Sequence, residues 1–157
     1  MWKIKVNAAK TQVIIFPHRN TQRLMPSTMI RLPETSIPWS SEIRYLGLNI
    51  DKKLLFRSHV EQIVTNSIII FRRLYPLINR RSKLSVINKL AIYKQVILPM
   101  MLYASTVWQS CAKTHRQKLQ IIQNTFLKMI LNLHPRTNTI EFHRLANMHL
   151  LENIIVP

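Results

Sequence analysis

The spacing of apolar residues changes near residue 56 and divides the chain in two. Before this point, the runs at residues 13–16 and 43–50 are rich in β-branched and aromatic side chains, which predicts strands. After it, apolar residues recur every three or four positions, which predicts helices. A small antiparallel sheet or hairpin followed by a bundle of about four helices is an α+β fold. We therefore expect two parts, residues 1–55 and residues 56–157.

Proline breaks up the first part. Half of the eight prolines lie between residues 17 and 42. Because proline has no backbone N–H, this segment should form only short edge strands, one of them at residues 28–32. Residues 1–16 read as a strand or strand pair. The run 43–50 is the clearest strand, and it contains Gly47, the only glycine, which marks either a β-bulge or a close approach of another backbone.

The second part carries helix-start signals and apolar stripes. A Ser, Thr or Asn followed three residues later by Glu or Gln can form a capping box at the start of a helix, in which each side chain bonds the backbone N–H of the other residue. The predicted starts are Ser58 with Glu61, Ser82, Thr114 with Gln117, and Asn138 with Glu141. Pro99 should kink or end the second helix. The stripes that we expect to form the core are Val60, Val64, Phe71, Leu74 and Ile78; Val86, Leu90, Tyr93 and Ile97; Leu119, Ile122, Phe126, Met129 and Leu133; and Phe142, Leu145, Leu150 and Leu151.

Charge is the strongest compositional signal. The chain has 23 Lys and Arg against six Asp and Glu, a net charge of +17, and between residues 62 and 140 there is no acidic residue. Such a chain repels itself unless a polyanion neutralises it. Nucleic acid is the leading candidate for the partner, and an anionic membrane surface or an acidic protein is the alternative. A third explanation is that the charge merely reflects a basic source proteome. No run reaches the ~20 consecutive apolar residues that a membrane span requires, so we do not expect the chain to cross a membrane.

Candidate catalytic chemistry is sparse. No two of the six acids lie within seven residues of each other, so there is no local carboxylate cluster for metal-ion catalysis, and Asp51 reads as an exposed turn acid. A single glycine excludes a P-loop and a Gly-x-Ser-x-Gly elbow. Cys111 and His115, which share a helix face, remain a third hypothesis as a nucleophile and its base. We predict no metal site, no small-molecule cofactor and no complete active site.

Two groups of cations are candidates for binding. The junction cluster surrounds the predicted junction of the first two helices and consists of Arg72, Arg73, Arg80, Arg81 and Lys83. Guanidinium groups grip phosphate oxygens with paired hydrogen bonds. The helix-start cluster, Lys113, Arg116 and Lys118, opens the third predicted helix, where it opposes the helix dipole unless an anion comes to that end. The alternative for either cluster is an ordinary solvated face.

Two segments together resemble one protein family. Residues 2–11, ending in Asn7-Ala8-Ala9-Lys10-Thr11 and leading to Phe16, resemble the Asn-x-x-Lys-Thr strand that closes the palm of reverse transcriptases. Tyr45-Leu46-Gly47-Leu48, followed by Asp51, resembles the Tyr/Phe-Leu-Gly hairpin of these enzymes, the primer grip. The chain looks most like the reverse transcriptases of non-LTR (LINE-type) retrotransposons of the jockey-like group. The resemblance covers nearly the whole chain.

The resemblance implies roles for particular residues. Residues 1–55 would be the end of the palm and the primer grip, and residues 56–157 would be thumb-like. Tyr45, Leu46, Gly47 and Leu48 would hold the 3′ end of the primer, and Lys10 would be an accessory general acid. The partner would be an RNA template/DNA primer duplex, and Mg²⁺ would belong to the intact parent polymerase.

The chain also departs from the family. It contains no Asp-Asp pair. In the family, the catalytic Asp pair lies upstream of the position that corresponds to residue 2. We therefore expect a fragment of an RNA-directed DNA polymerase that retains elements for binding template and primer but is inactive alone. Its expected location is intracellular, in the nucleus or a cytoplasmic ribonucleoprotein. The alternative function is a basic helical protein that binds anionic membrane surfaces or acidic partners without catalysis.

Overall fold

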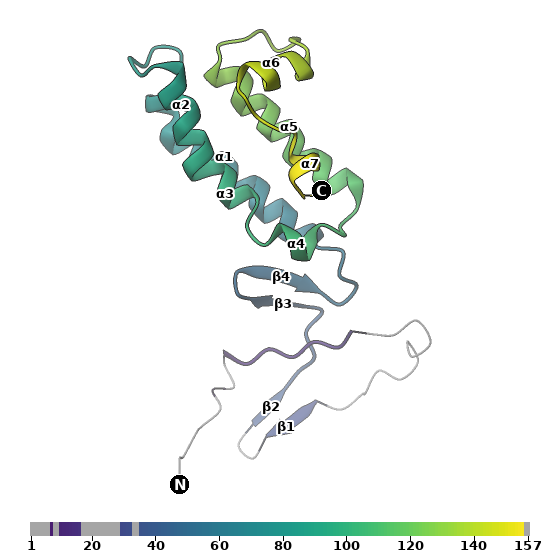
Figure 1. The fold of residues 1–157 in the computed structure, drawn as a ribbon. Coiled ribbons are helices and arrows are strands. Elements are labelled where there is room, and N and C mark those ends of the chain that lie inside the picture. Colours follow the sequence, from purple (N-terminus) through teal and green to yellow (C-terminus); the bar gives the residue numbers. More distant parts are fainter. Residues whose placement is uncertain (1–6, 8–9, 17–28, 33–34, 156–157) are drawn as a thin grey trace. The chain divides into compact units, whose positions relative to one another are not determined.

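The computed structural model describes residues 7, 10–16, 29–32 and 35–155. Contacts within the chain divide it into two units, Met1–Phe56 and Arg57–Pro157, and each unit is described by itself. The first unit contains the strands and the second the helices (Figure 1). The predicted α+β fold, with small antiparallel pairs before a group of helices, is confirmed. Within the described residues, no helix has the length and apolar character needed to cross a membrane.

The first unit holds two antiparallel hairpins. Strand β1 (Ile30–Leu32) pairs with β2 (Thr35–Ile37), so β1 lies within the strand predicted at residues 28–32. Strand β3 (Glu42–Tyr45) pairs with β4 (Leu48–Asp51), with Glu42 opposite Asp51 and Tyr45 opposite Leu48. The prediction of one strand over residues 43–50 is therefore wrong: the run is two strands joined by a two-residue turn.

The turn between β3 and β4 explains the single glycine. Leu46 has φ 47° and Gly47 has φ 81°. Positive φ at both central residues identifies a type I′ turn, whose twist matches that of the flanking strands. Glycine adopts this region freely because it has no Cβ, whereas Leu46 is strained there by about 1 kcal/mol. Gly47 is thus a hairpin-turn glycine, and the predicted bulge does not form.

The segment before the hairpins forms less strand than predicted. Among residues 10–16, Val13 makes a single parallel bridge to Trp39, and the Ser40 N–H donates to the Val13 carbonyl at 2.7 Å. Pro38 has no N–H, so it cannot donate the next backbone hydrogen bond, and the pairing does not extend past Trp39 on that side. The strand predicted across residues 13–16 is wrong, and the rest of the strand predicted for residues 1–16 lies largely outside the described residues.

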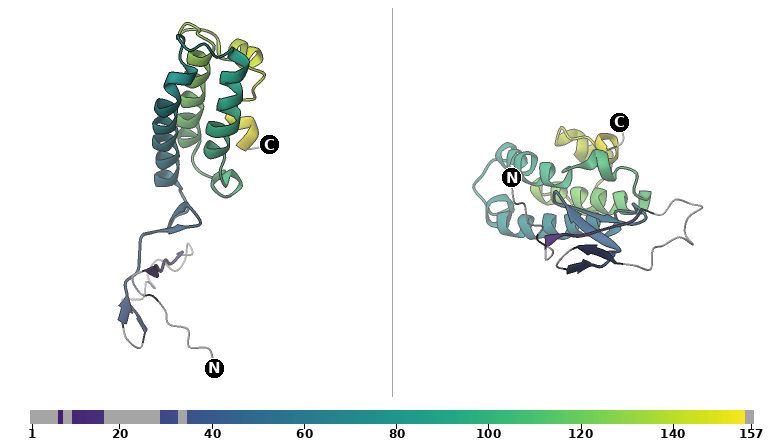
Figure 2. Two further views of the ribbon diagram at one scale, coloured as in Figure 1. Left: turned by 90° about the vertical axis from the view of Figure 1, so that its left-hand side faces the viewer. Right: turned by 90° about the horizontal axis from the view of Figure 1, so that it is seen from below.

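The second unit consists of two long helices, a composite helix and short helices (Figures 1 and 2). The elements are α1 (Arg57–Ile78), α2 (Val86–Ile92), the π-helix η2 (Tyr93–Ile97), α3 (Leu98–Met101), α4 (Ser105–Trp108), α5 (Lys113–Ile130), α6 (Thr139–Leu145) and α7 (Leu151–Ile155). Because α2, η2 and α3 follow one another without a break, they form one rod. The four predicted helices correspond to α1, this rod, α5 and α6.

Helices α1 and α5 pack side by side and run in the same direction. The rings of Phe71 and Phe126 stack with centroids 3.8 Å apart and planes 5° apart, while nearer the starts of both helices Glu61 contacts Lys118. Helix α5 also contacts α2, α6 and α7, so it is the centre of the unit. Each buried apolar side chain of this core contributes about 1.5–3 kcal/mol. The stripe predictions fail at Val86, Met129 and Leu145, whose side chains are exposed near the ends of their helices. At the end of α5, Leu127 and Ile130 are buried in place of Met129.

Some of the predicted helix starts are confirmed and others are wrong. Asn138 caps α6 as predicted, accepting from the Ile140 N–H at 2.9 Å. The cap of α2 is Ser85, which accepts from the Asn88 N–H at 3.3 Å. The helix cap predicted at Ser82 is wrong, because the Ser82 N–H donates to the Asn79 side chain and so belongs to the preceding turn. The capping box predicted at residues 114–117 is also wrong, since α5 begins at Lys113 and its cap position makes no side-chain hydrogen bond.

Pro99 shapes the rod without ending it. A proline in an α-helix lacks the N–H that would reach back four residues, and its ring collides with the carbonyl there. The chain relieves this conflict by widening into a π-turn just before the proline, where the Leu98 N–H donates to the Tyr93 carbonyl five residues back. The wider turn keeps Tyr93, Ile97 and Met101 on the buried side.

Two short helices were not predicted. Helix α4 places Trp108 in the core, where its indole N–H donates to the Tyr103 carbonyl at 2.9 Å and His59 packs against its ring. Helix α7 is joined to α5 through polar contacts, since the Leu151 N–H donates to Gln120 Oε1 at 2.7 Å. Both elements are too short for a period in the sequence to identify them.

Candidate nucleic-acid interface

The tip of the β3–β4 hairpin presents apolar side chains to solvent. Tyr45 is 61% exposed and Leu46 is 71% exposed. Gly47 is exposed beside them, so the turn backbone is open to a ligand. Leu48 is buried and so supports the hairpin rather than forming its surface. Three of the four residues predicted as a primer grip thus share an exposed tip, and the fourth does not.

Asp51 ends the hairpin and organises the residues that follow it. Its Oδ1 accepts from the Lys53 N–H at 2.9 Å and its Oδ2 from the Phe56 N–H at 2.8 Å. Partial burial raises the pKa of Asp51, but hydrogen bonds from the Leu55, Phe56 and Lys53 backbone lower it by more, so the pKa lies below its ordinary value. Asp51 is therefore a turn acid, as predicted, although it is half-buried rather than exposed.

Lys10 lies on a turn in the first unit. The carbonyl of Asn7 accepts from the Lys10 N–H at 3.1 Å and from the Thr11 hydroxyl at 2.8 Å. The Lys10 side chain is exposed, and its ammonium group contacts no partner in the part of the chain that the structure describes. The accessory-acid role stays a prediction.

The junction cluster is exposed and unpaired. Its five side chains lie on the last turns of α1 and on the loop 79–85, and none has a hydrogen-bond or ion-pair partner among the described residues. The loop is held in place by Asn79, whose Nδ2 donates to the Tyr75 carbonyl at 2.8 Å and whose Oδ1 accepts from the Arg81 N–H at 2.7 Å. The cations are therefore presented on an ordered loop.

Lys89 supports this loop from below. It is only 5% exposed, and its ammonium group donates to the carbonyls of Asn79 at 2.7 Å and Ser82 at 3.4 Å. A cation at the carboxyl end of α1 also compensates the helix dipole. The sequence shows Lys89 as one more positive charge, but the structure makes it part of the fold.

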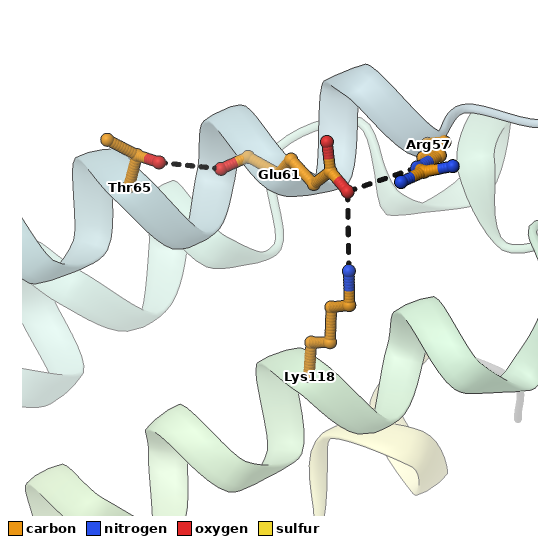
Figure 3. A network of polar contacts seen from close by, with 4 residues as sticks. All are labelled: Arg57, Glu61, Thr65 and Lys118. Atoms are coloured by element: carbon orange, nitrogen blue, oxygen red, sulfur yellow. Dashed lines mark hydrogen bonds and ion pairs between the residues drawn. The ribbon is translucent and has the colours of Figure 1, made fainter.

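The helix-start cluster does not form a free basic surface. Arg116 turns inward, and its Nη1 donates to the carbonyls of Gln109 at 2.6 Å and Cys111 at 2.9 Å. Lys118 pairs with Glu61 at 3.3 Å, and Arg57 contacts the same carboxylate oxygen at 3.2 Å (Figure 3). Only Lys113 is exposed without such a contact among the described residues. The inference that an anion must offset the helix dipole is therefore unnecessary, since the fold itself uses these cations.

The hypothesis of a Cys111 nucleophile is not supported. Cys111 is 2% exposed, and burial raises the pKa of its thiol by more than the nearby charge of Arg116 lowers it. A buried thiol with a raised pKa forms little of the reactive thiolate.

Metal binding has no basis in the described residues. They contain no group of three or more His, Cys, Asp or Glu side chains placed to hold an ion. No step is assigned to Mg²⁺ in this chain.

One feature was missed by the sequence analysis. Because α1 and α5 run in parallel, the loops that follow them, residues 79–85 and 131–138, lie at the same end of the helical unit (Figures 1 and 2). Exposed Arg136 joins the junction cluster at this end, and a groove opens between the two helices. No local pattern indicates this proximity, since it depends on how two helices that are separated by the whole of residues 79–112 pack together.

Comparison with known proteins relates nearly the whole chain to polymerases of mobile elements. A probable RNA-directed DNA polymerase from transposon X-element of Drosophila melanogaster is 32% identical over 143 residues, which are 91% of this chain and 15% of the relative. A probable RNA-directed DNA polymerase from transposon BS of the same species is 30% identical over 98% of this chain and 17% of the relative. The RNA-directed DNA polymerase from mobile element jockey of Drosophila funebris is 30% identical over 89% of this chain and 15% of the relative.

The chain is thus homologous to one segment of the RNA-directed DNA polymerases of non-LTR retrotransposons, and the resemblance noted in the sequence is confirmed. It spans 15–17% of the length of these curated relatives. No protein-family model matches the chain. No solved structure matches it either.

Proposed function

We propose that this chain supplies the end of the palm, the primer grip and the thumb of a retrotransposon reverse transcriptase, and that it binds an RNA template/DNA primer duplex. The palm end and primer grip are residues 1–55, and the thumb-like region is residues 56–157. The observation that carries the proposal is the junction cluster. Five exposed cations without partners in the described chain, in a homologue of RNA-directed DNA polymerases, form the surface best suited to a nucleic-acid backbone.

The duplex would contact two regions. The junction cluster would hold phosphates of either strand, with no preference for sequence because its groups meet only the backbone. The hairpin tip, with Tyr45, Leu46 and Gly47 exposed, would lie against the 3′ end of the primer. In the same proposal Lys10 is an accessory general acid that does not contribute to duplex affinity. The proposal locates the chain inside the cell, in the nucleus or a cytoplasmic ribonucleoprotein, together with its nucleic acid.

Salt-dependent binding tests this proposal. The purified chain is titrated against a fluorescent RNA/DNA duplex at several salt concentrations. If about five phosphates are contacted, the plot of log K against log salt should have a slope of about −4 to −5. Changing four arginines together (R72Q, R73Q, R80Q and R81Q) should reduce that slope by about 3 to 4 and weaken every duplex alike.

A charge-matched pair of variants removes the effect of net charge. R80Q with R81Q and R57Q with K118Q each remove two positive charges, but the second pair removes cations that are already bound to Glu61. The first pair should lower duplex affinity at least tenfold more than the second. Affinity that is independent of salt, equal losses from both pairs, or tighter binding to anionic liposomes than to the duplex would each overturn the proposal.

A further inference from the structure

A groove runs between the carboxyl-terminal halves of α1 and α5. It has a volume of about 560 Å³, within the range of small-molecule sites in proteins. Its lining includes Tyr75 and Arg80 on one side and Ile121, Thr125, Met129 and Asn132 on the other. All of these residues belong to the helical unit, so the groove does not depend on the first unit.

One part of the lining suits a flat aromatic ligand. Tyr75 is 50% exposed, so one part of its ring is open to a ligand in the groove. Across the groove, Ile121 and Met129 expose apolar side chains on α5. A planar group inserted here would stack on the tyrosine and cover apolar surface that is otherwise in contact with water.

Another part of the lining suits a phosphate. The Arg80 guanidinium is exposed and has no partner in the described chain. The second cation, Lys128, is already held, because its ammonium group donates to the Pro135 carbonyl and lies 5.1 Å from the centre of the Phe142 ring. Arg80 is therefore the lining cation that remains available to an incoming anion.

Two further polar groups that line the groove can meet the edge of a base. The Thr125 hydroxyl donates to the Ile121 carbonyl at 2.9 Å, which leaves its oxygen able to accept. The side-chain amide of Asn132, at the end of α5, has no hydrogen-bond partner among the described residues. An amide offers both donors and an acceptor, so it can bond to any of the four bases.

We propose that this groove binds single-stranded nucleic acid, with one base stacked on Tyr75 and the adjoining phosphate on Arg80. The inference rests on the proposed function, because it extends the same basic end of the helical unit. A groove of this volume holds one or two nucleotides but not a double helix, so its occupant is an unpaired strand. The duplex on the junction cluster and a single strand in the groove would then meet at Arg80.

Oligonucleotide binding by the full chain tests the inference. Fluorescence anisotropy is measured with labelled eight-nucleotide dT and U strands and, in parallel, with an RNA/DNA duplex. Y75A should weaken single-strand binding about tenfold, the usual effect of removing one stacking platform, while Y75F should retain it. Duplex affinity should change less than twofold in both variants.

Tyr103 provides the matched control. It is a comparably exposed tyrosine at 54%, and it does not line the groove. Y103A should leave the single-strand affinity unchanged, and thermal unfolding should show that Y75A and Y103A are both folded. In the unchanged chain, irradiation of a 5-iodouridine strand should crosslink Tyr75, which peptide mass spectrometry identifies without any substitution.

The outcomes separate this inference from the proposed function. Unchanged single-strand affinity in Y75A, or crosslinks confined to residues outside the groove, would overturn the groove proposal even if the duplex still depends on the junction cluster. Loss of both ligands in R80Q together with normal single-strand binding in Y75A would make Arg80 part of a general phosphate-binding surface outside the groove and would also overturn the groove proposal. If the unchanged chain binds neither ligand, both proposals fail.

Discussion

Cations around the starts of α1 and α5 and cations around the ends of these helices behave differently. At the starts, Arg57 and Lys118 contact Glu61, and Arg116 donates to two backbone carbonyls. At the ends, the junction cluster and Arg136 have no partner in the described chain. The two groups look alike as runs of charge in the sequence. The unpaired cations at the helix ends leave their positive potential available to a ligand, whereas the cations at the helix starts are bound to groups within the fold.

The comparison teaches that a cation's role depends on what its donors can reach. A Lys or Arg within reach of unpaired carbonyls stabilises the fold, as Arg116 and Lys89 do. The junction-cluster cations are exposed and have no such carbonyl partner in the described chain, so they retain their capacity to bind phosphate. Substitutions can therefore separate the two roles by measuring stability and affinity independently.

The largest loss of stability is expected from Arg116→Met. This change removes two charge-assisted hydrogen bonds and leaves the Gln109 and Cys111 carbonyls without their donor, which should cost about 3 kcal/mol. Urea unfolding measures this loss. Arg81→Met, in the junction cluster, should change stability by no more than about 0.5 kcal/mol. Equal losses in the two variants would remove the distinction between the clusters.

Lys89→Met should have the next largest effect. It deprives the Asn79 and Ser82 carbonyls of their buried donor, at a cost of about 2 kcal/mol. Duplex affinity, measured well below the unfolding temperature, should fall less than in R80Q with R81Q. If Lys89→Met instead abolishes binding without reducing stability, Lys89 belongs to the interface and not to its support.

Ser85→Ala should have a smaller effect, and it tests the loop that presents the junction cluster. Removing this cap should cost about 1 kcal/mol. Ser82→Ala removes only a turn hydrogen bond to the Leu84 N–H at 3.2 Å, so its cost should be lower. Thermal unfolding of the two variants compares them directly, and the reverse order would mean that α2 begins earlier than described.

The smallest effect should come from the ion pairs at Glu61. Hydrogen bonds from Arg57 and then Lys118 lower the pKa of Glu61. A carboxylate with a lowered pKa stabilises the fold above its unfolded pKa, near 4.3, and loses that contribution as the pH falls through its folded pKa. Glu61→Gln should therefore lower the melting temperature by about 2 °C or less at pH 7, and this difference should shrink as the pH falls below about 4. High salt should reduce the difference, and a salt-independent loss would contradict this account.

Much of the fold could be predicted because it follows from local patterns. The periods of α1 and α5 identify both helices, and the stripe residues Phe71 and Phe126 are in fact stacked in the core. The hairpin around Gly47 follows from the resemblance, whereas the alternation of side chains alone suggested one strand. The alternation does shift from odd to even positions at Leu46-Gly47, but each strand is too short for this shift to identify the turn.

The parts that could not be predicted depend on long-range packing. Ser82 and Ser85 have the same chemistry, and only the bonds of Asn79 decide which of them caps a helix. The inward turn of Arg116 depends on carbonyls of the segment before α5, which no pattern marks as unpaired. The groove depends on the parallel packing of α1 and α5. Sequence therefore located the junction cluster but could not distinguish it from the helix-start cluster.

The π-turn in the rod makes the length of the chain critical at one place. A π-turn holds one residue more than an α-helical turn, so deletion of one residue between Tyr93 and Ile97 would leave an ordinary α-helical turn before Pro99. The proline ring would then collide with the carbonyl four residues before it. Insertions and deletions among related copies of this segment should accordingly be tolerated in the loop 131–138 and eliminated from the π-turn.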